Sequence, residues 1–398
     1  MKNVSDRLNR LAESATLAMA RMSRELKEEG QDIIALSLGE PDFDTPHFIK
    51  QAAKQAIDNN FSHYTPVPGL LSLREAICKK FKRDNNLNFT PEQIVTSTGA
   101  KQSLANLCLS LLNPEDEVLL PCPFWVSYSE IIKLAEAVPI EIPSSIASDY
   151  KVTAQQLEGA ITPKTKLLMF SSPCNPSGTV YTQKELEDIA KMLEKYPDIY
   201  IVSDEIYEHI NFTNAHFSIG TIPSMKERTI TVNGVSKGFA MTGWRVGYIG
   251  APLWIAKACN KVQGQITSAT CAIAQKATET AVLANPDEVA TEMRSTFLRR
   301  RDMLLNLLND IPGIKCNVPE GAFYIFPDVS YYFGKKHGEQ TIEDANDVCM
   351  YLLNKAHVAL VAGDAFGNPE CVRISYAASD EKLIEAAKRM KENLALLK

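Results

Sequence analysis

Lys237 lies in a short loop between two apolar segments, and its amine could attack a carbonyl carbon. The β-branched run Thr229–Val232 predicts a buried strand ended by an Asn-Gly pair, and Val246–Ile249 predicts a second strand. Desolvation at the strand end and the nearby cation Arg245 would lower the pKa of the lysine and leave a nucleophilic free amine. Taken alone, a lysine in a loop is more often a surface residue, so this interpretation needs partners elsewhere in the chain.

Four other predicted strands end in polar or aromatic residues that have no evident role in packing. These strand ends are followed by the segments TGAK (98–101), PCPFW (121–125), SPCNPSG (172–178) and DEIY (204–207). In an open parallel sheet, ligands bind beyond the carboxyl ends of the strands. Together with the Lys237 loop, these segments predict one ligand site at that edge.

One part of this site is suited to a phosphate group. Gly99, Ala100 and Lys101 are predicted to open a helix, where unpaired amides and the positive end of the helix dipole favour an anion. The Ser236 hydroxyl and the Arg245 guanidinium could complete the phosphate-binding cup. Taken alone, the glycine turn would be read as an ordinary helix start.

Three further side chains could bind a flat ring. Trp125 could stack on its face, although a tryptophan beside prolines is more often part of the core. Asp204, at a strand end, needs a cationic or hydrogen-bonding partner such as a protonated ring nitrogen, unless it caps a helix. Tyr207 could donate to a ring oxygen. With Lys237 and the phosphate cup, these groups describe a site for a flat, phosphorylated, nitrogen-containing aldehyde, namely pyridoxal 5'-phosphate.

The elements that must position these residues alternate between strands and helices. The predicted strands are Ile94–Ser97, Glu117–Leu120, Pro139–Ile142, Lys166–Ser171, Tyr200–Ser203, Arg228–Val232 and Val246–Ile249, and helices are expected over 47–58, 70–84, 101–112 and 183–195. This alternation is typical of an α/β fold with a mostly parallel seven-stranded sheet and helices on both faces. We assign it to a large cofactor-binding domain, residues 46–285.

A smaller α+β domain is expected from residues 13–45 and 286–398, with residues 1–12 as an N-terminal arm. Its predicted helices cover 287–309 and 380–396, and its predicted strands cover 33–38, 321–326, 357–361 and 371–376. A loop that begins at Gly39 is expected to end in a helix start, with Asp44 or Thr45 as the cap and Pro46 at the first helical position.

Composition limits the classes of function. The chain has 398 residues, 45% of them hydrophobic and 23% charged, which is typical of a soluble protein with more than one core. Its net charge of −6 leaves no basic surface for a nucleic acid. Nine single cysteines without a C-x-x-C pair predict free thiols in a reducing cytoplasm and no metal site. The N-terminal residues lack the apolar core of a signal peptide and no apolar run reaches membrane-spanning length, so we expect a cytoplasmic protein without a membrane partner.

Several segments together resemble the class I aminotransferases of pyridoxal-phosphate fold type I, and within them the bacterial aspartate aminotransferase branch. The resemblance extends over nearly the whole chain and rests on LSLGEPDFDTP, HYTPVPGLLSLREAI, TSTGAKQSL, PFWVSY, SSPCNPSGTVY, VSDEIYEH, VNGVSKGFAMTGWRVGY, EGAFYIFPDV and VRISYA. The combination of SDEIYE with SKGFAMTGWRVGY is the most specific part of it.

The resemblance implies a role for each residue around the ring. Lys237 would form the Schiff base with the cofactor and carry the proton between carbon atoms. Asp204 would hold the proton on the ring nitrogen, and Tyr207 would bond the ring hydroxyl. Asn175 would contact the same oxygen and the substrate carboxylate, and Trp125 would stack on the ring.

The resemblance also implies the groups that hold the phosphate and the substrate. Gly99, Ala100, Ser236 and Arg245 would bind the phosphate, helped by Tyr64 from the partner subunit of a homodimer. Arg373 would clamp the substrate α-carboxylate, with the backbone of Gly39 closing over it.

Two departures from the family pattern are visible. Gly234 replaces a serine that stands three residues before the lysine in better-studied aspartate aminotransferases, which puts one phosphate contact in doubt. Those enzymes also use an arginine of the partner subunit for the distal carboxylate of the substrate, and here Lys101 is the candidate for that task.

Three functions follow from these observations. The first is transfer of the amino group of L-aspartate to 2-oxoglutarate, which gives oxaloacetate and L-glutamate. The second keeps the same groups but uses an aromatic or prephenate-like substrate, with a β-lyase as a more distant variant. The third, a regulator that binds the cofactor without chemistry, is disfavoured because such regulators carry a DNA-binding domain for which few residues precede Gly39.

Overall fold

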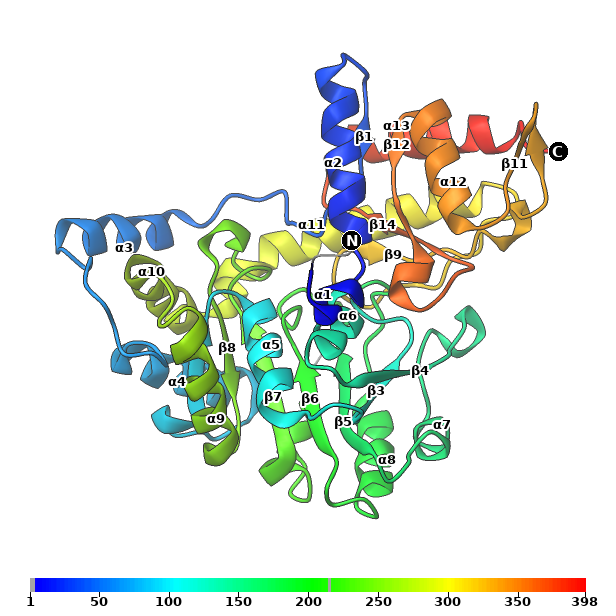
Figure 1. The fold of residues 1–398 in the computed structure, drawn as a ribbon. Helices are drawn as coiled ribbons and strands as arrows, with labels where there is room; N and C mark the ends of the chain where they lie inside the picture. Colours follow the sequence, from blue (N-terminus) through cyan, green and yellow to red (C-terminus); the bar gives the residue numbers. More distant parts are fainter. Residues whose placement is uncertain (1–3, 214–215) are drawn as a thin grey trace.

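The computed structural model describes residues 4–213 and 216–398 and contains a central seven-stranded sheet (Figure 1). The strand order is β2-β8-β7-β6-β5-β3-β4, and β8 alone runs antiparallel to its neighbours. The strands are β2 (Ile94–Ser97), β3 (Glu117–Pro121), β4 (Val138–Ile142), β5 (Thr165–Ser171), β6 (Tyr200–Asp204), β7 (Thr229–Gly234) and β8 (Gly247–Gly250). The predicted mostly parallel sheet is therefore confirmed.

Helices cover both faces of this sheet, as predicted. Along β5, Leu167 and Met169 pack into the cluster that includes α5, α6 and α9, whereas Leu168 and Phe170 pack into the cluster that includes α8. This is the two-residue alternation of a strand buried on both sides. The helices are α3 (His47–Asp58), α4 (Leu71–Asn85), α5 (Ala100–Leu111), α6 (Ser127–Leu134), α7 (Ala154–Gly159), α8 (Gln183–Leu193), α9 (Leu253–Ile266) and α10 (Ala272–Leu283).

A second group of elements lies above the sheet in the view of Figure 1. It consists of α2 (Ala15–Glu28), β1 (Ile34–Ala35), α11 (Pro286–Asn309), β9 (Tyr324–Ile325), β10 (Lys336–His337), β11 (Gln340–Thr341), α12 (Ala345–Tyr351), β12 (Val358–Ala359), β13 (Val361–Ala362), β14 (Val372–Ser375) and α13 (Asp380–Leu394). Because β1 pairs with β12, the segment after α2 shares a core with the C-terminal third of the chain. This pairing supports our assignment of residues 13–45 and 286–398 to one domain, whose boundaries stay a proposal.

Two local predictions were wrong. The single strand expected over 357–361 is split at Leu360, because β12 pairs with β1 while β13 pairs with β14. Pro46 precedes α3 instead of occupying its first helical position, and no side chain caps that helix. Thr45 instead donates through Oγ1 to the carbonyl of Ala240, at 2.7 Å, and so ties this loop to the segment that follows Lys237.

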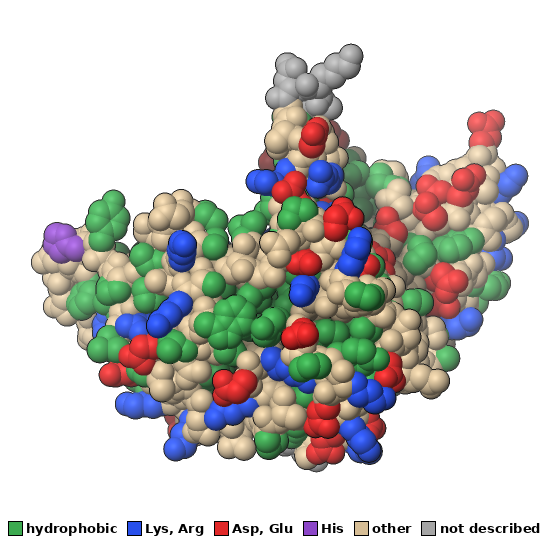
Figure 2. All heavy atoms as spheres, turned by 60° about the horizontal axis from the view of Figure 1, so that its bottom comes forward, with side chains coloured by type: hydrophobic (Ala, Val, Ile, Leu, Met, Phe, Trp, Pro, Cys, Tyr) green, Lys and Arg blue, Asp and Glu red, His purple; other side chains and the backbone are tan. Residues whose placement is uncertain are grey.

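The distribution of charge on the surface and the state of the cysteines agree with what the sequence predicts. Figure 2 shows Lys and Arg side chains interspersed with Asp and Glu over the face that it displays. All nine cysteines are free, as expected. Within residues 4–213 and 216–398, no helix is both long enough and apolar enough to cross a membrane.

Candidate active site

A pocket of about 320 Å³ lies at the carboxyl ends of the parallel strands, where the sequence placed the site. Its lining includes most of the predicted residues, namely Gly39, Ala100, Lys101, Trp125, Asn175, Asp204, Tyr207, Ser236, Lys237, Arg245 and Arg373. Residues from β6, β14 and the loops after β3, β5 and β7 thus meet in one cavity, although they are far apart in the sequence.

Lys237 is half-buried in this pocket, and its amine donates a hydrogen bond to the carbonyl of Gly39 at 2.6 Å. Burial first, and then the neighbouring Arg373 charge, lower the pKa of Lys237 to about 8, while Glu40 acts in the opposite direction. The predicted shift is therefore present, and an appreciable fraction of the amine is free near neutral pH.

Asp204 is buried at the end of β6 and accepts two hydrogen bonds. Tyr128 donates its hydroxyl proton to Oδ2 at 2.7 Å, and the amide of Ile206 donates to Oδ1 at 3.2 Å. Burial raises the pKa of Asp204 to about 6, although both hydrogen bonds act in the opposite direction. A cationic ring nitrogen would offset this burial, so the carboxylate fits the role expected for it.

Arg373 on β14 is 1% exposed, and only part of its N–H donors are bonded within the chain. Nη1 donates to Oδ1 of Asn175 at 3.0 Å and Nη2 donates to the carbonyl of Ser37 at 2.5 Å. Its Nε has no hydrogen-bond partner among the described residues, although it is buried. A buried guanidinium without a carboxylate partner suits the α-carboxylate of an amino acid.

The start of α5 forms the end of the pocket that suits a phosphate group. Gly99 precedes the helix with a φ of +85°, a conformation that glycine adopts without strain. A Cβ at this position would overlap the Arg245 guanidinium, so the lack of a side chain brings the cation to the helix N-terminus. The buried Ser236 lines the same end. Unpaired amides, a helix dipole, a hydroxyl and a cation together fit a phosphate monoester.

Lys101 and Trp125 stand together at the exposed side of the pocket. The Lys101 amine lies 5.0 Å from the centroid of the Trp125 ring, within the range of a cation–π contact. Partial burial lowers the pKa of Lys101, and the charge of Arg245 lowers it further. The pocket therefore contains another cationic side chain besides Arg373, Arg245 and Lys237.

Some pocket residues were not singled out from the sequence. Tyr128 bonds Asp204, and the Tyr324 hydroxyl lies 2.8 Å from that of Tyr207. Both lie in quoted family segments, PFWVSY and EGAFYIFPDV, which offered the only signal. Ser14 and Thr16, at the start of α2, also line the pocket. Nothing in their local sequence indicates a ligand.

Tyr64 lies outside this pocket. It is fully exposed, at 100%, beside a separate hollow of about 580 Å³ that includes residues 269–273. Its predicted contact with the phosphate bound by a partner subunit stays a prediction.

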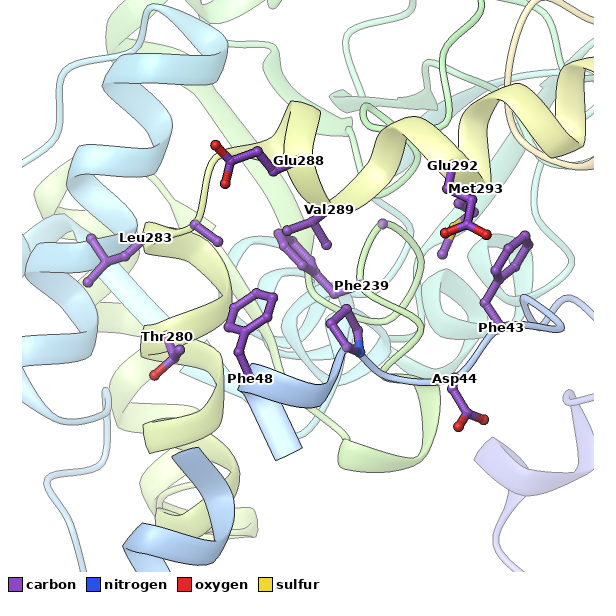
Figure 3. A pocket seen from close by; sticks show the side chains of 13 residues that line it. Phe43, Asp44, Phe48, Phe239, Thr280, Leu283, Glu288, Val289, Glu292 and Met293 are labelled. Carbon is purple, nitrogen blue, oxygen red and sulfur yellow. The ribbon is translucent and has the colours of Figure 1, made fainter. Parts of the chain in front are cut away.

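A larger hollow of about 850 Å³ is separate from this pocket, and Figure 3 shows side chains that line it. Gly238 and Phe239 line it, together with the carboxylates Asp44, Glu288 and Glu292. Neither Lys237, Asp204 nor Arg373 contributes to its lining. The smaller pocket is therefore the candidate active site.

Comparison with known proteins agrees with this geometry. Residues 31–390 match the family described as aminotransferase class I and II. A bifunctional aspartate aminotransferase and glutamate/aspartate-prephenate aminotransferase from Petunia hybrida is 46% identical over 401 residues, which cover 100% of this chain and 84% of that protein. An aspartate/prephenate aminotransferase from Cereibacter sphaeroides is 44% identical, with 98% of each chain covered. The crystal structure of an aspartate aminotransferase from Rhizobium meliloti has a TM-score of 0.96 and 40% identity, with 100% of both chains covered. The chain belongs to the class I and II aminotransferases and is an enzyme that depends on pyridoxal phosphate.

Proposed function

We propose that this protein transfers the amino group of L-aspartate to 2-oxoglutarate and releases oxaloacetate and L-glutamate. The observation that carries the proposal is that two of the pocket's cationic side chains, Arg373 and Lys101, stay available for a substrate once Lys237 and Arg245 are assigned to the cofactor. A dicarboxylic amino acid offers one carboxylate to each cation. Relatives that are named for aspartate support the same choice.

The residues of the pocket divide the work of this reaction. When bound, pyridoxal phosphate supplies an electron sink that makes the substrate Cα–H acidic. Lys237 Nζ, with its lowered pKa, takes up the proton that leaves Cα. Arg373 and Asn175 orient the α-carboxylate and so set which Cα bond faces Lys237. Asp204 would provide a buried negative charge that keeps the ring nitrogen protonated.

An aromatic or prephenate-like substrate is the second candidate. Two relatives carry prephenate in their names. The pocket also has apolar side chains that a ring could contact, because Leu17 and Leu38 line it and are 59% and 42% exposed. Both candidates use the same Arg373 contact and differ in what they require of Lys101.

Replacement of Lys101 by alanine tests the choice between the two. If Lys101 binds the distal carboxylate, Lys101→Ala should lower kcat/KM for aspartate by roughly 10- to 100-fold, equivalent to about 1.4–2.8 kcal/mol. Phenylalanine, which lacks that carboxylate, should be nearly unaffected. The measurement is steady-state kinetics of both donors with 2-oxoglutarate, and of aspartate and glutamate with prephenate as acceptor.

Parallel losses for all donors, with weaker cofactor binding, would instead place Lys101 at the phosphate. Wild-type protein that prefers aromatic donors would overturn the aspartate assignment and leave the aminotransferase chemistry intact. Arg373→Leu is the matched control, because every donor shares the α-carboxylate and all should suffer alike.

We also propose that the enzyme is a cytoplasmic homodimer. Nine free cysteines suit a reducing compartment. The fully exposed Tyr64 suits a contact with another subunit, since an isolated tyrosine on a surface is available to a partner's site.

A further inference from the structure

A cluster of buried polar side chains lies beside the active site, on the α4 side of β6. Within residues 204–208, Asp204 and Tyr207 line the pocket, whereas Glu205 and Glu208 do not. The two glutamates are 1% and 7% exposed. One short segment therefore presents cofactor-binding groups to the pocket and carboxylates to this cluster.

Glu208 connects three elements. It forms an ion pair with Lys80 of α4, and it accepts hydrogen bonds from Nδ2 of Asn85 at 2.6 Å and from Nδ2 of Asn233 at 2.9 Å. Lys80 is itself 1% exposed and also donates to Oδ1 of Asn85 at 2.6 Å. These contacts join α4 and β7 to the segment that follows β6.

Glu205 accepts a hydrogen bond from the same Asn85 side-chain amide that bonds Glu208. Asn85 donates to it at 2.8 Å, Ser203 at 2.9 Å, and the His216 ring nitrogen Nε2 lies 2.7 Å away. Burial by itself lowers the pKa of His216, but the Glu205 carboxylate outweighs burial and raises it. The cluster thus gives each glutamate its own partner, Lys80 for Glu208 and His216 for Glu205.

The charge of Glu208 is compensated, although it lies in the interior. Burial by itself raises the pKa of Glu208, but Lys80 first, and then His209 and His216, reverse the shift and hold the pKa at about 2. A buried ion pair generally adds little stability compared with apolar side chains of similar volume. Its directional contacts do constrain the geometry of the elements that it joins.

The cluster contacts the Lys237 loop on both sides of the lysine. Asn233, which bonds Glu208, lies in β7 four residues before Lys237. On the other side, the His209 ring packs edge-on against Phe239, with ring centroids 5.5 Å apart. His209 also occupies the space beside Gly238, because a Cβ there would lie 2.8 Å from its ring. The position of the lysine loop thus depends on residues next to Glu208.

We propose that Glu208, held by Lys80, Asn85 and Asn233, is a positioning residue that fixes the Lys237 loop relative to Asp204. The Lys237 amine faces charged or titratable groups from several elements, namely Glu40, Asp204, Tyr207, Arg245 and Arg373. A shift of the loop changes its distance to each of them and so changes its acid–base behaviour. The inference rests on the lysine chemistry of the family and not on the choice of amino donor.

The test compares Glu208→Gln with the wild-type holoenzyme. Glutamine keeps the volume and an acceptor oxygen for Asn233 but removes the charge opposite Lys80. We expect kcat to fall by roughly 10- to 100-fold while KM for the amino donor changes by less than about threefold. We also expect the pH midpoint of the visible absorbance of the lysine-bound cofactor to shift, which needs no turnover.

Arg228→Met is the matched control for a loss of stability. Arg228 is a buried cation, 8% exposed, that donates to the carbonyls of Leu193 and Tyr196 and does not line the pocket. The Arg228→Met substitution should lower Tm without a change in kcat or in the pH midpoint of the absorbance.

A Glu208→Gln protein that loses Tm but keeps the wild-type kcat and midpoint would overturn the proposal. If this variant does not fold, Asn233→Ala replaces it, because it leaves the Lys80–Glu208 pair intact. The same changes, smaller in size, are then expected, and a wild-type kcat and midpoint would again overturn the proposal.

Discussion

Burial changes the acid–base properties of the two central residues in opposite directions. It lowers the pKa of the Lys237 ammonium to about 8 and raises that of the Asp204 carboxyl to about 6. Each shift favours the neutral form, as expected for a charge that leaves water. Between these values Asp204 is ionised and part of Lys237 is free, so both groups are in the state the reaction needs.

The reaction of cofactor-free protein with pyridoxal phosphate should accelerate as the pH rises through about 8, because only the unprotonated amine attacks a carbonyl. An unperturbed lysine would give a midpoint near 10.5. Stopped-flow absorbance across this pH range measures the midpoint. Arg373→Leu removes a cation and should move it upward, whereas Asp204→Asn removes an anion and should move it downward. An unchanged midpoint in both variants would contradict this account.

Tyr128→Phe should slow proton abstraction from the substrate. The change removes the hydrogen bond to Oδ2 of Asp204, a bond to a charged group that is worth about 1.5–3 kcal/mol. The expected loss is roughly 10- to 100-fold in the single-turnover rate, together with a rise in the pKa of Asp204. Tyr181→Phe is the control, because Tyr181 is also buried and bonded through its hydroxyl, to Val152, but lies outside the pocket. Equal rates for both variants would remove Tyr128 from the site.

At the scale of elements, each strand end contributes one part of the site and α5 contributes its N-terminus. The parallel strands β3, β5, β6 and β7 bring their carboxyl ends to one edge, which explains why distant segments converge there. The phosphate end depends on how closely Arg245 can approach the first turn of α5. That approach is set by Gly99.

Gly99→Ala should therefore weaken cofactor binding more than it affects chemistry. An alanine is strained at a φ of +85° and would displace the Arg245 guanidinium. The strain of about 1–3 kcal/mol corresponds to a rise in Kd for pyridoxal phosphate of roughly 5- to 150-fold, with kcat largely kept at saturating cofactor. Fluorescence titration of cofactor-free protein measures this Kd. Gly159→Ala, at an exposed position of α7 with nothing within 4 Å, should leave it unchanged.

At the scale of the whole molecule, one predicted group cannot reach its site within a single chain. Tyr64 is fully exposed and lies outside the pocket that holds Lys237. If a partner subunit completes the site, each chain supplies a tyrosine to the other. Activity would then depend on assembly.

Mixing two inactive variants tests this dependence. In a dimer of Lys237→Ala with Tyr64→Ala, one site carries both changes and the other carries neither, so unfolding and refolding the mixture should restore activity. A mixture of Lys237→Ala with Arg373→Leu should restore none, because both residues line the same pocket of one chain. Equal results for the two mixtures would place Tyr64 outside the active site.

Much of the fold and site followed from local sequence. The β-branched runs and the turn residues after them located the strands, since a buried strand leaves a short apolar segment that periodicity can detect. Lys237, Asp204 and Arg373 were recognisable because each sits at a strand or in a family segment whose residue types suit one cofactor. The lowered pKa of Lys237 was also predictable, because a strand end in a buried sheet implies desolvation.

Other features depended on residues that the sequence cannot bring together. Tyr128 and Asp204 are 76 positions apart, and neither local pattern indicates that they are bonded. The Lys80–Glu208 pair likewise joins a helix to a strand end, and each residue alone would be read as part of a solvated face. Local rules also failed where a distant partner decided the outcome, as when Thr45 bonds Ala240 and does not cap α3. The sequence by itself therefore determined which elements form and which chemistry they carry, because these depend on near neighbours and residue type. Only the tertiary structure decided which buried charges are paired and which atoms Arg373 bonds, because those depend on contacts across the fold.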